Sequence, residues 1–225
     1  MLEKIWNLMR EQDNLVKEGR RRAVAMLKTT HEMFHSVIQG IHEGPGGGHR
    51  RRVADIDKHI NHEQREVRRM VFEHLALSST RDLLEGLRLV TVVIDIERLG
   101  DLSKNIEELF EMMPKGLDFG EGEGVFNEIE QLALDVFKHT EAAFEHNDEA
   151  AARAAIAGYN EVARRCEKHL RDALTETSGD DCVRRSDLGF MLLLRYLKRT
   201  CGHLKNIASA VTNPFDRIGF KDGIG

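Results

Sequence analysis

Acidic side chains crowd one short stretch of the chain, residues 92–110, which reads VVIDIERLGDLSKNIEELF and holds Asp95, Glu97 and Asp101. Glu97 and Asp101 are four residues apart, so both carboxylates lie on one face of a helix. Like charges at this spacing repel each other, and Gly100 costs a helix about 1 kcal/mol relative to alanine. A bound cation, or another helix packed closely against the glycine, would explain why a helix carries both features here.

A second pair with the same spacing, Asp57 and Asn61, lies upstream in a segment that is also expected to be helical. Together the four side chains offer oxygen donors, which suit Mg²⁺, Ca²⁺ or Mn²⁺ and iron bound by carboxylates. By itself the spacing favours a solvated charged face over a metal site. Other acid pairs show the same spacing, namely Glu107 with Glu111 and Glu141 with Glu145.

The remaining polar residues do not assemble a recognisable catalytic set. Glu32 and His35 resemble half of the di-iron motif of helical bundles, but that site needs a second Glu-x-x-His, which the chain lacks. No acid, base and nucleophile stand in a recognisable context, so we expect no enzyme activity. The three cysteines, Cys166, Cys182 and Cys201, form no CxxC pair, and we interpret them as buried thiols in a reducing compartment.

The overall composition indicates an acidic helical protein. The 225 residues carry a formal net charge of −5, and only 6% of them are aromatic. Nucleic-acid binding is not expected, because a concentrated basic face is missing. The runs 20–22 and 50–52 are interpreted as a solvated helix face or a helix start, and a local anionic partner stays open as the alternative. The longest apolar stretches, 89–94 and 190–194, are too short to cross a bilayer, and the N-terminus lacks the apolar core of a signal peptide. We therefore expect a cytoplasmic protein that reaches a membrane only through recruitment.

Apolar spacing and helix breakers predict an all-α fold of two tandem three-helix bundles. The first expected helix ends near Ile41. The other five cover about 53–77, 80–112, 125–145, 148–175 and 186–211. The divisions that follow are a first repeat over 1–113, a glycine-rich linker over 114–124, a second repeat over 125–212 and an irregular tail over 213–225.

An internal repeat supports this division. Residues 89–108 align with residues 190–209 at an offset of 101, which pairs Arg98 with Arg199, Lys104 with Lys205, Asn105 with Asn206 and Ile106 with Ile207. We expect the two asparagines to be structural, with hydrogen bonds across helices inside each bundle, because polar groups at helix contacts usually serve packing specificity. Gly100 is expected to be structural as well.

The run DIERLGDLSKNIEEL resembles the signature of the PhoU family of phosphate-signalling regulators. The residues that match it are Glu97, Arg98, Gly100, Asp101, Asn105 and Ile106. The second copy, YLKRTCGHLKNIAS, resembles a degenerate form of the same segment. The resemblance covers nearly the whole chain and implies two three-helix bundles related by a pseudo-twofold axis.

The resemblance also implies a function. PhoU proteins are adaptors that link a phosphate transporter to a sensor histidine kinase and restrain phosphate uptake and starvation signalling. Several bind metal through acid pairs on the second and third helices of a repeat. Carried over to this chain, the metal ligands would be Asp57, Asn61, Glu97 and Asp101, with Asn61 departing from the usual acid.

The second repeat departs further, because Lys198 and Gly202 replace the two acids of the signature, and we expect no metal there. Arg98 would contact a partner or pair with a nearby acid. We also expect a homodimer. Two other functions remain open at this stage: a carboxylate-cluster protein that binds or stores metal, and a purely structural helical scaffold.

Overall fold

The computed structural model describes residues 2–44, 49–77, 82–113, 119–175 and 185–220, with side chains placed from residue 15 onward except at 49–51 and 121. Within these residues the fold is entirely helical. The long helices are α1 (Leu2–Glu43), α2 (His49–Leu77), α3 (Leu83–Glu111), α4 (Glu123–His146), α5 (Glu149–Thr175) and α6 (Arg185–Thr212). Two short 3-10 helices, η2 (Gly120–Gly122) and η3 (Phe215–Arg217), precede α4 and follow α6. The predicted all-α class is confirmed.

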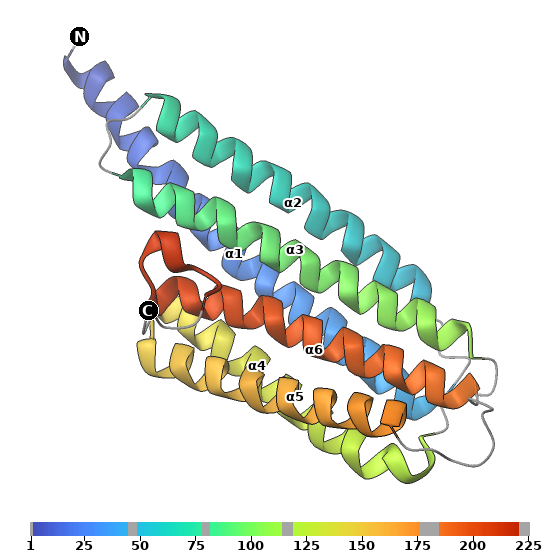
Figure 1. Cartoon of the computed structure of the whole chain (residues 1–225). Helices are drawn as coiled ribbons and strands as arrows, with labels where there is room; N and C mark the ends of the chain where they lie inside the picture. Colours follow the sequence, from blue (N-terminus) through green and yellow to red (C-terminus); the bar gives the residue numbers. More distant parts are fainter. Residues whose placement is uncertain (1, 45–48, 78–81, 114–118, 176–184, 221–225) are drawn as a thin grey trace.

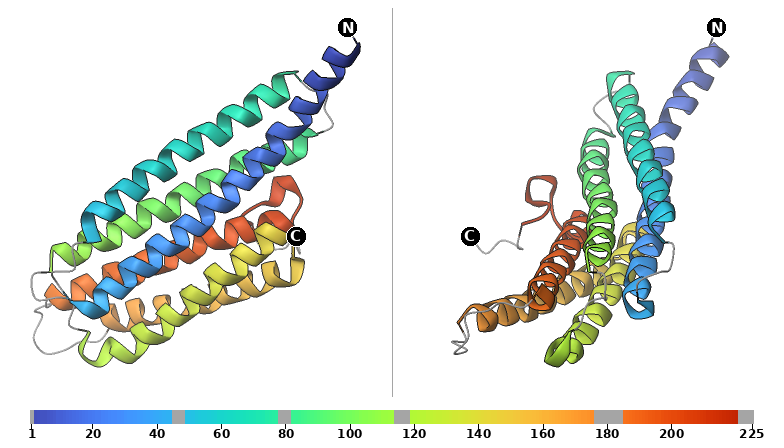
Figure 2. Two further views of the ribbon diagram at one scale, coloured as in Figure 1. Left: turned by 180° about the vertical axis from the view of Figure 1, so that it is seen from behind. Right: turned by 90° about the vertical axis from the view of Figure 1, so that its right-hand side faces the viewer.

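The helices form two bundles of three, α1–α3 and α4–α6 (Figure 1). The third helix of each bundle lies at the centre of the molecule, and α3 runs antiparallel to α6 (Figures 1 and 2). This arrangement agrees with the pseudo-twofold axis that the family resemblance implied: the axis exchanges α1 with α4 and α3 with α6. Buried side chains from all six helices make one continuous core, in which Phe34, Ile96, Phe137 and Leu193 are among the largest.

The two bundles contact each other through α1 and α4 as well as through α3 and α6. Lys28 donates to Glu145 at 2.7 Å, and His31 Nδ1 lies 3.0 Å from the Glu141 carboxylate. The His31 ring also stacks on Phe137, with ring centroids 4.8 Å apart. Glu141 and Glu145 share the spacing of Glu97 and Asp101. Each of them has a partner on α1, His31 for Glu141 and Lys28 for Glu145.

The junction between α4 and α5 shows why these two helices end and begin where they do. Asn147 adopts a left-handed conformation, with φ of 55°, at the end of α4. The side chain of Asp148 then accepts the backbone N–H groups of Ala150 and Ala151 at 2.9 and 3.1 Å, which caps α5. Asparagine tolerates the left-handed region and aspartate is a preferred N-cap, so both residues suit their places.

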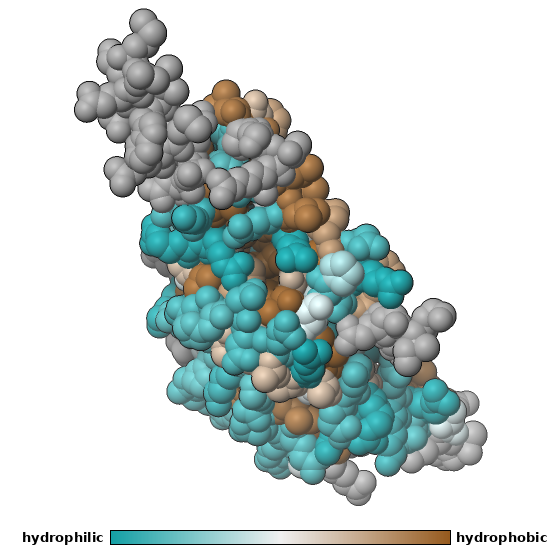
Figure 3. Space-filling view, turned by 90° about the vertical axis from the view of Figure 1, so that its left-hand side faces the viewer, coloured by the Kyte–Doolittle hydropathy of each residue, from teal (hydrophilic) through white to brown (hydrophobic). Residues whose placement is uncertain are grey.

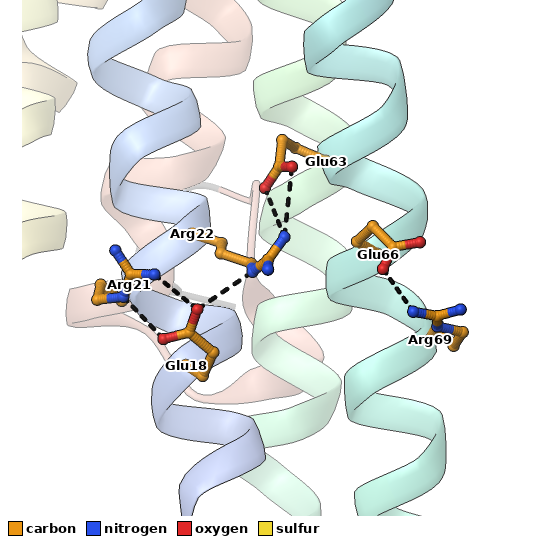
Figure 4. A network of polar contacts seen from close by, with 6 residues as sticks. All are labelled: Glu18, Arg21, Arg22, Glu63, Glu66 and Arg69. Carbon is orange, nitrogen blue, oxygen red and sulfur yellow. Dashed lines mark hydrogen bonds and ion pairs between the residues drawn. The ribbon is translucent and has the colours of Figure 1, made fainter.

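A polar network ties α1 to α2 (Figure 4). Glu18 accepts from Arg21 at 2.6 Å and from Arg22 at 3.2 Å, and Arg22 also reaches Glu63 on α2 at 3.1 Å. The hydrogen bond from Arg21 is the main cause that lowers the pKa of Glu18 to about 2. The second bundle holds a similar arrangement, in which Arg165 on α5 pairs with Glu161 and with Glu128 on α4.

The tail, which was expected to be irregular, contains the short 3-10 helix η3, and over residues 213–220 it folds back on α6. Asn213 Nδ2 donates to the Arg217 carbonyl at 3.0 Å, and the Gly219 N–H donates to Ser209 Oγ at 2.7 Å. Gly219 has φ of 84°, and a side chain there would lie 3.0 Å from the Asn206 carboxamide oxygen. The glycine is therefore required for both the turn and the close approach.

Candidate functional site

The signature segment lies on α3 at a point where that helix packs closely against α2. Gly100 is buried, and a Cβ added to it would be 3.2 Å from the Ile60 Cδ1 atom and 3.9 Å from Asp57 Oδ1. The sequence offered two explanations for Gly100, a bound cation or a closely packed helix. The structure shows that α2 packs closely against it. The approach brings the acids of α2 and α3 together at the same level of the bundle.

Three of the four predicted metal ligands, Asp57, Glu97 and Asp101, lie close enough to influence one another electrostatically. Burial is the main cause that raises the pKa of Asp57, and it also raises the pKa of Glu97, with a further contribution from the negative charge of Asp101. The side chains of Asp57 and Glu97 are only 13% and 14% exposed. Glu97 Oε2 is buried and accepts no hydrogen bond from the described residues. An unsatisfied carboxylate oxygen in this position is destabilising.

Two cationic side chains of α3 partly offset these charges. Arg98 donates to Asp101 at 2.8 Å, and its Nε lies 3.5 Å from Glu97 Oε2. Lys104 Nζ lies 3.9 Å from Asp57 Oδ2. Arg98 thus pairs with nearby acids while its side chain stays 53% exposed. Three carboxylates and two cations leave the cluster with a formal charge of −1.

The fourth predicted ligand, Asn61, is half-buried one turn further along α2, and its backbone carbonyl accepts from Arg65 Nε at 3.2 Å. The neighbouring His59 and His62 are exposed. Within the part of the chain that has placed side chains, no group of three His, Cys, Asp or Glu residues gathers around a single point that a metal ion would occupy. The donor chemistry and the unsatisfied Glu97 oxygen suit a cation, whereas Arg98 and Lys104 already occupy part of the space around the acids.

The corresponding place in the second repeat is closed by protein groups. Lys198, at the position of Glu97, donates to Glu167 on α5. Gly202, at the position of Asp101, lies beside Tyr159, whose nearest atom would be 3.7 Å from an added Cβ. The lysine therefore supplies the positive charge that a cation would have supplied.

Asp95 is close to Glu97 in the sequence, but its side chain contacts α6. Its Oδ1 atom lies 2.7 Å from His203 Nδ1 and accepts from Asn206 Nδ2 at 3.1 Å, both on α6. The prediction that Asn206 bonds inside its own bundle was wrong: the bond crosses between the repeats, because the antiparallel packing of α3 and α6 brings Asp95 opposite it. Asn105, its counterpart, is half-buried on α3.

Sequence reasoning did not find the pairing of Asp95 with His203. The only available signal was that both residues lie on the third helix of their repeats, within the aligned segments 89–108 and 190–209. Two of the cysteines are buried as expected: Cys201 is 0% and Cys166 is 4% exposed, and burial raises the pKa of Cys166 to about 12. Cys182 lies outside the described residues.

Exposed apolar side chains mark the end of the first bundle. They come from the last turns of α2 and the first turn of α3: Phe72 is 72% exposed, Leu77 69%, Leu84 62% and Leu83 40%. We call these four residues the apolar end. Figure 3 shows hydrophobic residues at the upper end of this side of the molecule. None of the helices, searched over the described residues, combines the length and the hydrophobicity that crossing a bilayer demands.

Comparison with known proteins places this geometry in a family. The family model for the PhoU domain matches residues 23–110 and 126–211, which correspond to the two bundles. No curated protein matches the sequence. Among solved structures, PhoU from Pseudomonas aeruginosa matches with a TM-score of 0.79 at 21% identity, over 88% of this chain and 96% of that one.

A second solved structure, the phosphate transport system regulatory protein PhoU from Streptococcus pneumoniae, matches with a TM-score of 0.77 at 15% identity, over 89% of this chain and 95% of that one. At such low identities these structures support the fold. The family itself is shown by the two domain matches, which together span most of the chain and each contain one copy of the signature segment. The chain belongs to the PhoU family.

Proposed function

We propose that this protein is a cytoplasmic, non-catalytic adaptor that restrains phosphate uptake and starvation signalling by docking a phosphate transporter subunit or a sensor histidine kinase. The observation that carries the proposal is the match of both repeats to the PhoU domain, within a fold that resembles two phosphate-transport regulators over nearly their whole length. The described residues offer rigid helical faces rather than a set of reacting groups, which is consistent with function through binding.

The apolar end is the surface that best suits docking. Phe72, Leu77 and Leu84 expose 62–72% of their area near the end of α2 and the beginning of α3. Apolar side chains exposed near one another are typical of interaction sites. The partner would cover these side chains with an apolar groove or helix face. Arg98 on α3 supplies an exposed charge that a partner would contact in addition.

A divalent or iron ion at Asp57, Glu97 and Asp101 is the second part of the proposal. A bound cation would supply positive charge to three partly buried carboxylates, and it would require Arg98 and Lys104 to turn away from them. The unsatisfied Glu97 oxygen supports this part. Asn61 would contribute its carboxamide oxygen.

Affinity purification from the membranes of phosphate-rich and phosphate-starved cells tests the docking. We expect a phosphate transporter subunit or a sensor kinase to be recovered with the wild-type chain, in amounts that change with phosphate. The variant Phe72→Ser/Leu84→Ser should lose most of that partner. Leu174→Ser, which alters a leucine that is 78% exposed at the end of α5, is the matched control and should retain it.

Identification by mass spectrometry decides the outcome. Recovery of neither partner under either condition would reject the adaptor function. If the control and the double variant recover equal amounts of the partner, the apolar end is not the docking surface. Elemental analysis of the purified chain and of Glu97→Ala tests the cation: we expect about one ion per chain in the first and its loss in the second. Less than that in the wild type would reject the metal site alone.

The expected homodimer is checked separately by light scattering on the purified chain. If two copies cover each other's apolar end, Phe72→Ser/Leu84→Ser should halve the measured mass while Leu174→Ser leaves it unchanged. A dimer that survives the double variant would place the contact between copies elsewhere on the molecule.

A further inference from the structure

A cavity of about 590 Å³ lies where the two repeats meet, between α1, the beginning of α3 and the ends of α4 and α6. Its walls are partly apolar, with Leu84, Leu89 and Phe144, and they also carry Arg20 and Arg88. Cavities of this size commonly hold small molecules, and a few polar groups among apolar side chains usually fix their orientation.

The two arginines of this cavity differ from the other half-buried arginines. Among the placed side chains, four arginines are half-buried. Arg22 and Arg165 each pair with two carboxylates. Arg20 and Arg88 have no carboxylate of the described residues within 4.0 Å, and both line the cavity. The protein therefore neutralises half-buried guanidinium groups elsewhere and leaves these two uncompensated.

The hydrogen bonds of the two arginines leave their charge available. Arg20 Nη2 donates to the Phe144 carbonyl at 2.7 Å, and its guanidinium lies 4.9 Å from the centroid of the Phe144 ring. Arg88 Nη2 makes one long hydrogen bond, 3.5 Å, to the Asn213 carbonyl, while its Nε is buried and has no acceptor among the described residues. Neutral carbonyls orient a guanidinium without cancelling its charge, and an unsatisfied buried donor is destabilising.

Two acids also line the cavity, Glu85 and Glu145. The Glu145 carboxylate accepts from Lys28 at 2.7 Å, and this hydrogen bond is the main cause that lowers its pKa. Its negative charge is therefore already matched by a lysine outside the cavity wall. Glu85 is exposed in the first turn of α3. With Arg20 and Arg88 set against Glu85, the wall has an excess of positive charge.

The pseudo-twofold shows that the fold does not dictate an open cavity here. The offset of 101 residues puts Phe190 of α6 at the place of Leu89, and Gly189 at the place of Arg88. Around Phe190 aromatic rings pack together: Phe119 stacks on Phe126 with ring centroids 4.5 Å apart and meets Phe190 edge-on with centroids 5.5 Å apart. One half of the molecule thus closes this position with phenylalanines, whereas the other half keeps it open and places two arginines there.

We propose that this cavity binds a small organic anion. Its phosphate or carboxylate group would pair with Arg20 and Arg88, since the planar guanidinium donates two parallel hydrogen bonds to either group. Its apolar part would pack against Leu84, Leu89 and Phe144. Because the ligand would touch both repeats at once, it would favour their present arrangement over any other. The proposal requires no docking partner, although Leu84 belongs to both the cavity wall and the apolar end.

Titrations followed by the methyl NMR signals of Leu84, Leu89 and Val92 test the site with defined probes. Phenyl phosphate and benzoate carry the two candidate anionic groups on an apolar ring, inorganic phosphate lacks the ring, and phenol lacks the charge. We expect at least one of the two aromatic anions to shift these signals saturably and to bind about tenfold more tightly than phenol and inorganic phosphate, since a charge-assisted pair contributes more than a neutral hydrogen bond.

Arg88→Gln should weaken that binding by about tenfold or more, and Arg20→Gln should do the same, which keeps the test valid if one variant folds poorly. Arg195→Gln removes a positive charge from an exposed position on α6 and should leave the affinity unchanged. The proposal is overturned if neither aromatic anion shifts the signals saturably up to about 10 mM, which would leave less than about 3 kcal/mol of binding free energy. It is also overturned if Arg195→Gln weakens binding as much as Arg88→Gln.

Discussion

Glu97 carries a negative charge that its surroundings only partly compensate. It is half-buried, one of its oxygens accepts no hydrogen bond from the described residues, and its contact with Arg98 is 3.5 Å long. Burial raises its pKa above the ordinary value of 4.5, so the folded chain binds this proton more readily than the unfolded chain does. The contribution of Glu97 to stability is therefore fully present below pH 4.5 and is lost as the pH rises through the folded pKa.

Glu97→Gln should accordingly stabilise the metal-free chain at pH 7.5 by about 1 kcal/mol, or roughly 2–4 °C in Tm, because the neutral amide avoids the buried charge. The difference should shrink as the pH is lowered toward 4.5. Thermal unfolding in chelating buffer measures both. Glu32→Gln, at an exposed position of α1, is the control and should have no effect. A lower Tm for Glu97→Gln at pH 7.5 would show that Arg98 stabilises the charged form after all.

The buried cysteines allow a second test at the residue scale. Cys201 is fully buried and Cys166 nearly so, and burial raises the pKa of both thiols, which disfavours the reactive thiolate. In the variant Cys182→Ser, we expect a thiol reagent to label neither remaining cysteine in the native state within minutes and to label both after denaturation. Rapid labelling of the native chain would mean that α5 and α6 separate readily.

At the scale of the element, two helix glycines that look alike in the sequence have different surroundings. A Cβ at Gly158 of α5 would lie 2.6 Å from Val136 Cγ2 on α4, whereas one at Gly202 of α6 would meet only Tyr159, at 3.7 Å. Valine is stiff about χ1 and fully packed here, so it cannot turn aside. Gly158 thus permits the close packing of α4 against α5, and Gly202 meets no such constraint.

We expect Gly158→Ala to lower the free energy of unfolding by about 1–3 kcal/mol through overpacking. Gly202→Ala should raise it by up to about 1 kcal/mol, since alanine is the better helix former and has room. Urea unfolding of the two variants beside the wild type compares them directly. Equal stabilisation by both substitutions would show that α4 and α5 move apart at little cost.

The helices themselves could be predicted from sequence because their signals are local. Apolar spacing, Gly44, Asn147 and Asp148 placed the ends of most elements within a few residues of their observed positions. The signature segment also led to the three acids that lie together on α2 and α3. The partners of those acids could not be predicted, because Lys104 and Arg98 reach them through side-chain conformations that spacing does not specify. The Asp95 contact depends on the antiparallel packing of the repeats, which no local pattern encodes.

At the scale of the whole molecule, Asp95 joins the two repeats. Asp95→Ala would leave His203 and Asn206 without their acceptor and should destabilise the chain by about 1–3 kcal/mol. A double-mutant cycle with His203→Ala should give a coupling free energy of about 0.5–3 kcal/mol. Glu149→Ala with Arg153→Ala, an exposed pair on α5, is the control and should give less than about 1 kcal/mol. Equal coupling in the two cycles would mean that the α3–α6 contact contributes little.

The antiparallel α3–α6 contact also has a consequence for the order of folding. Each bundle is built from helices that follow one another along the chain, whereas Asp95 and His203 are 108 positions apart. Closing so long a segment of unfolded chain is entropically costly, so the bundles are expected to form before they dock against each other. Interactions that form after the transition state affect mainly the unfolding rate. Loss of the Asp95 contact should therefore speed unfolding while the refolding rate stays nearly unchanged. The contact would then affect how long the chain stays folded more than how fast it folds.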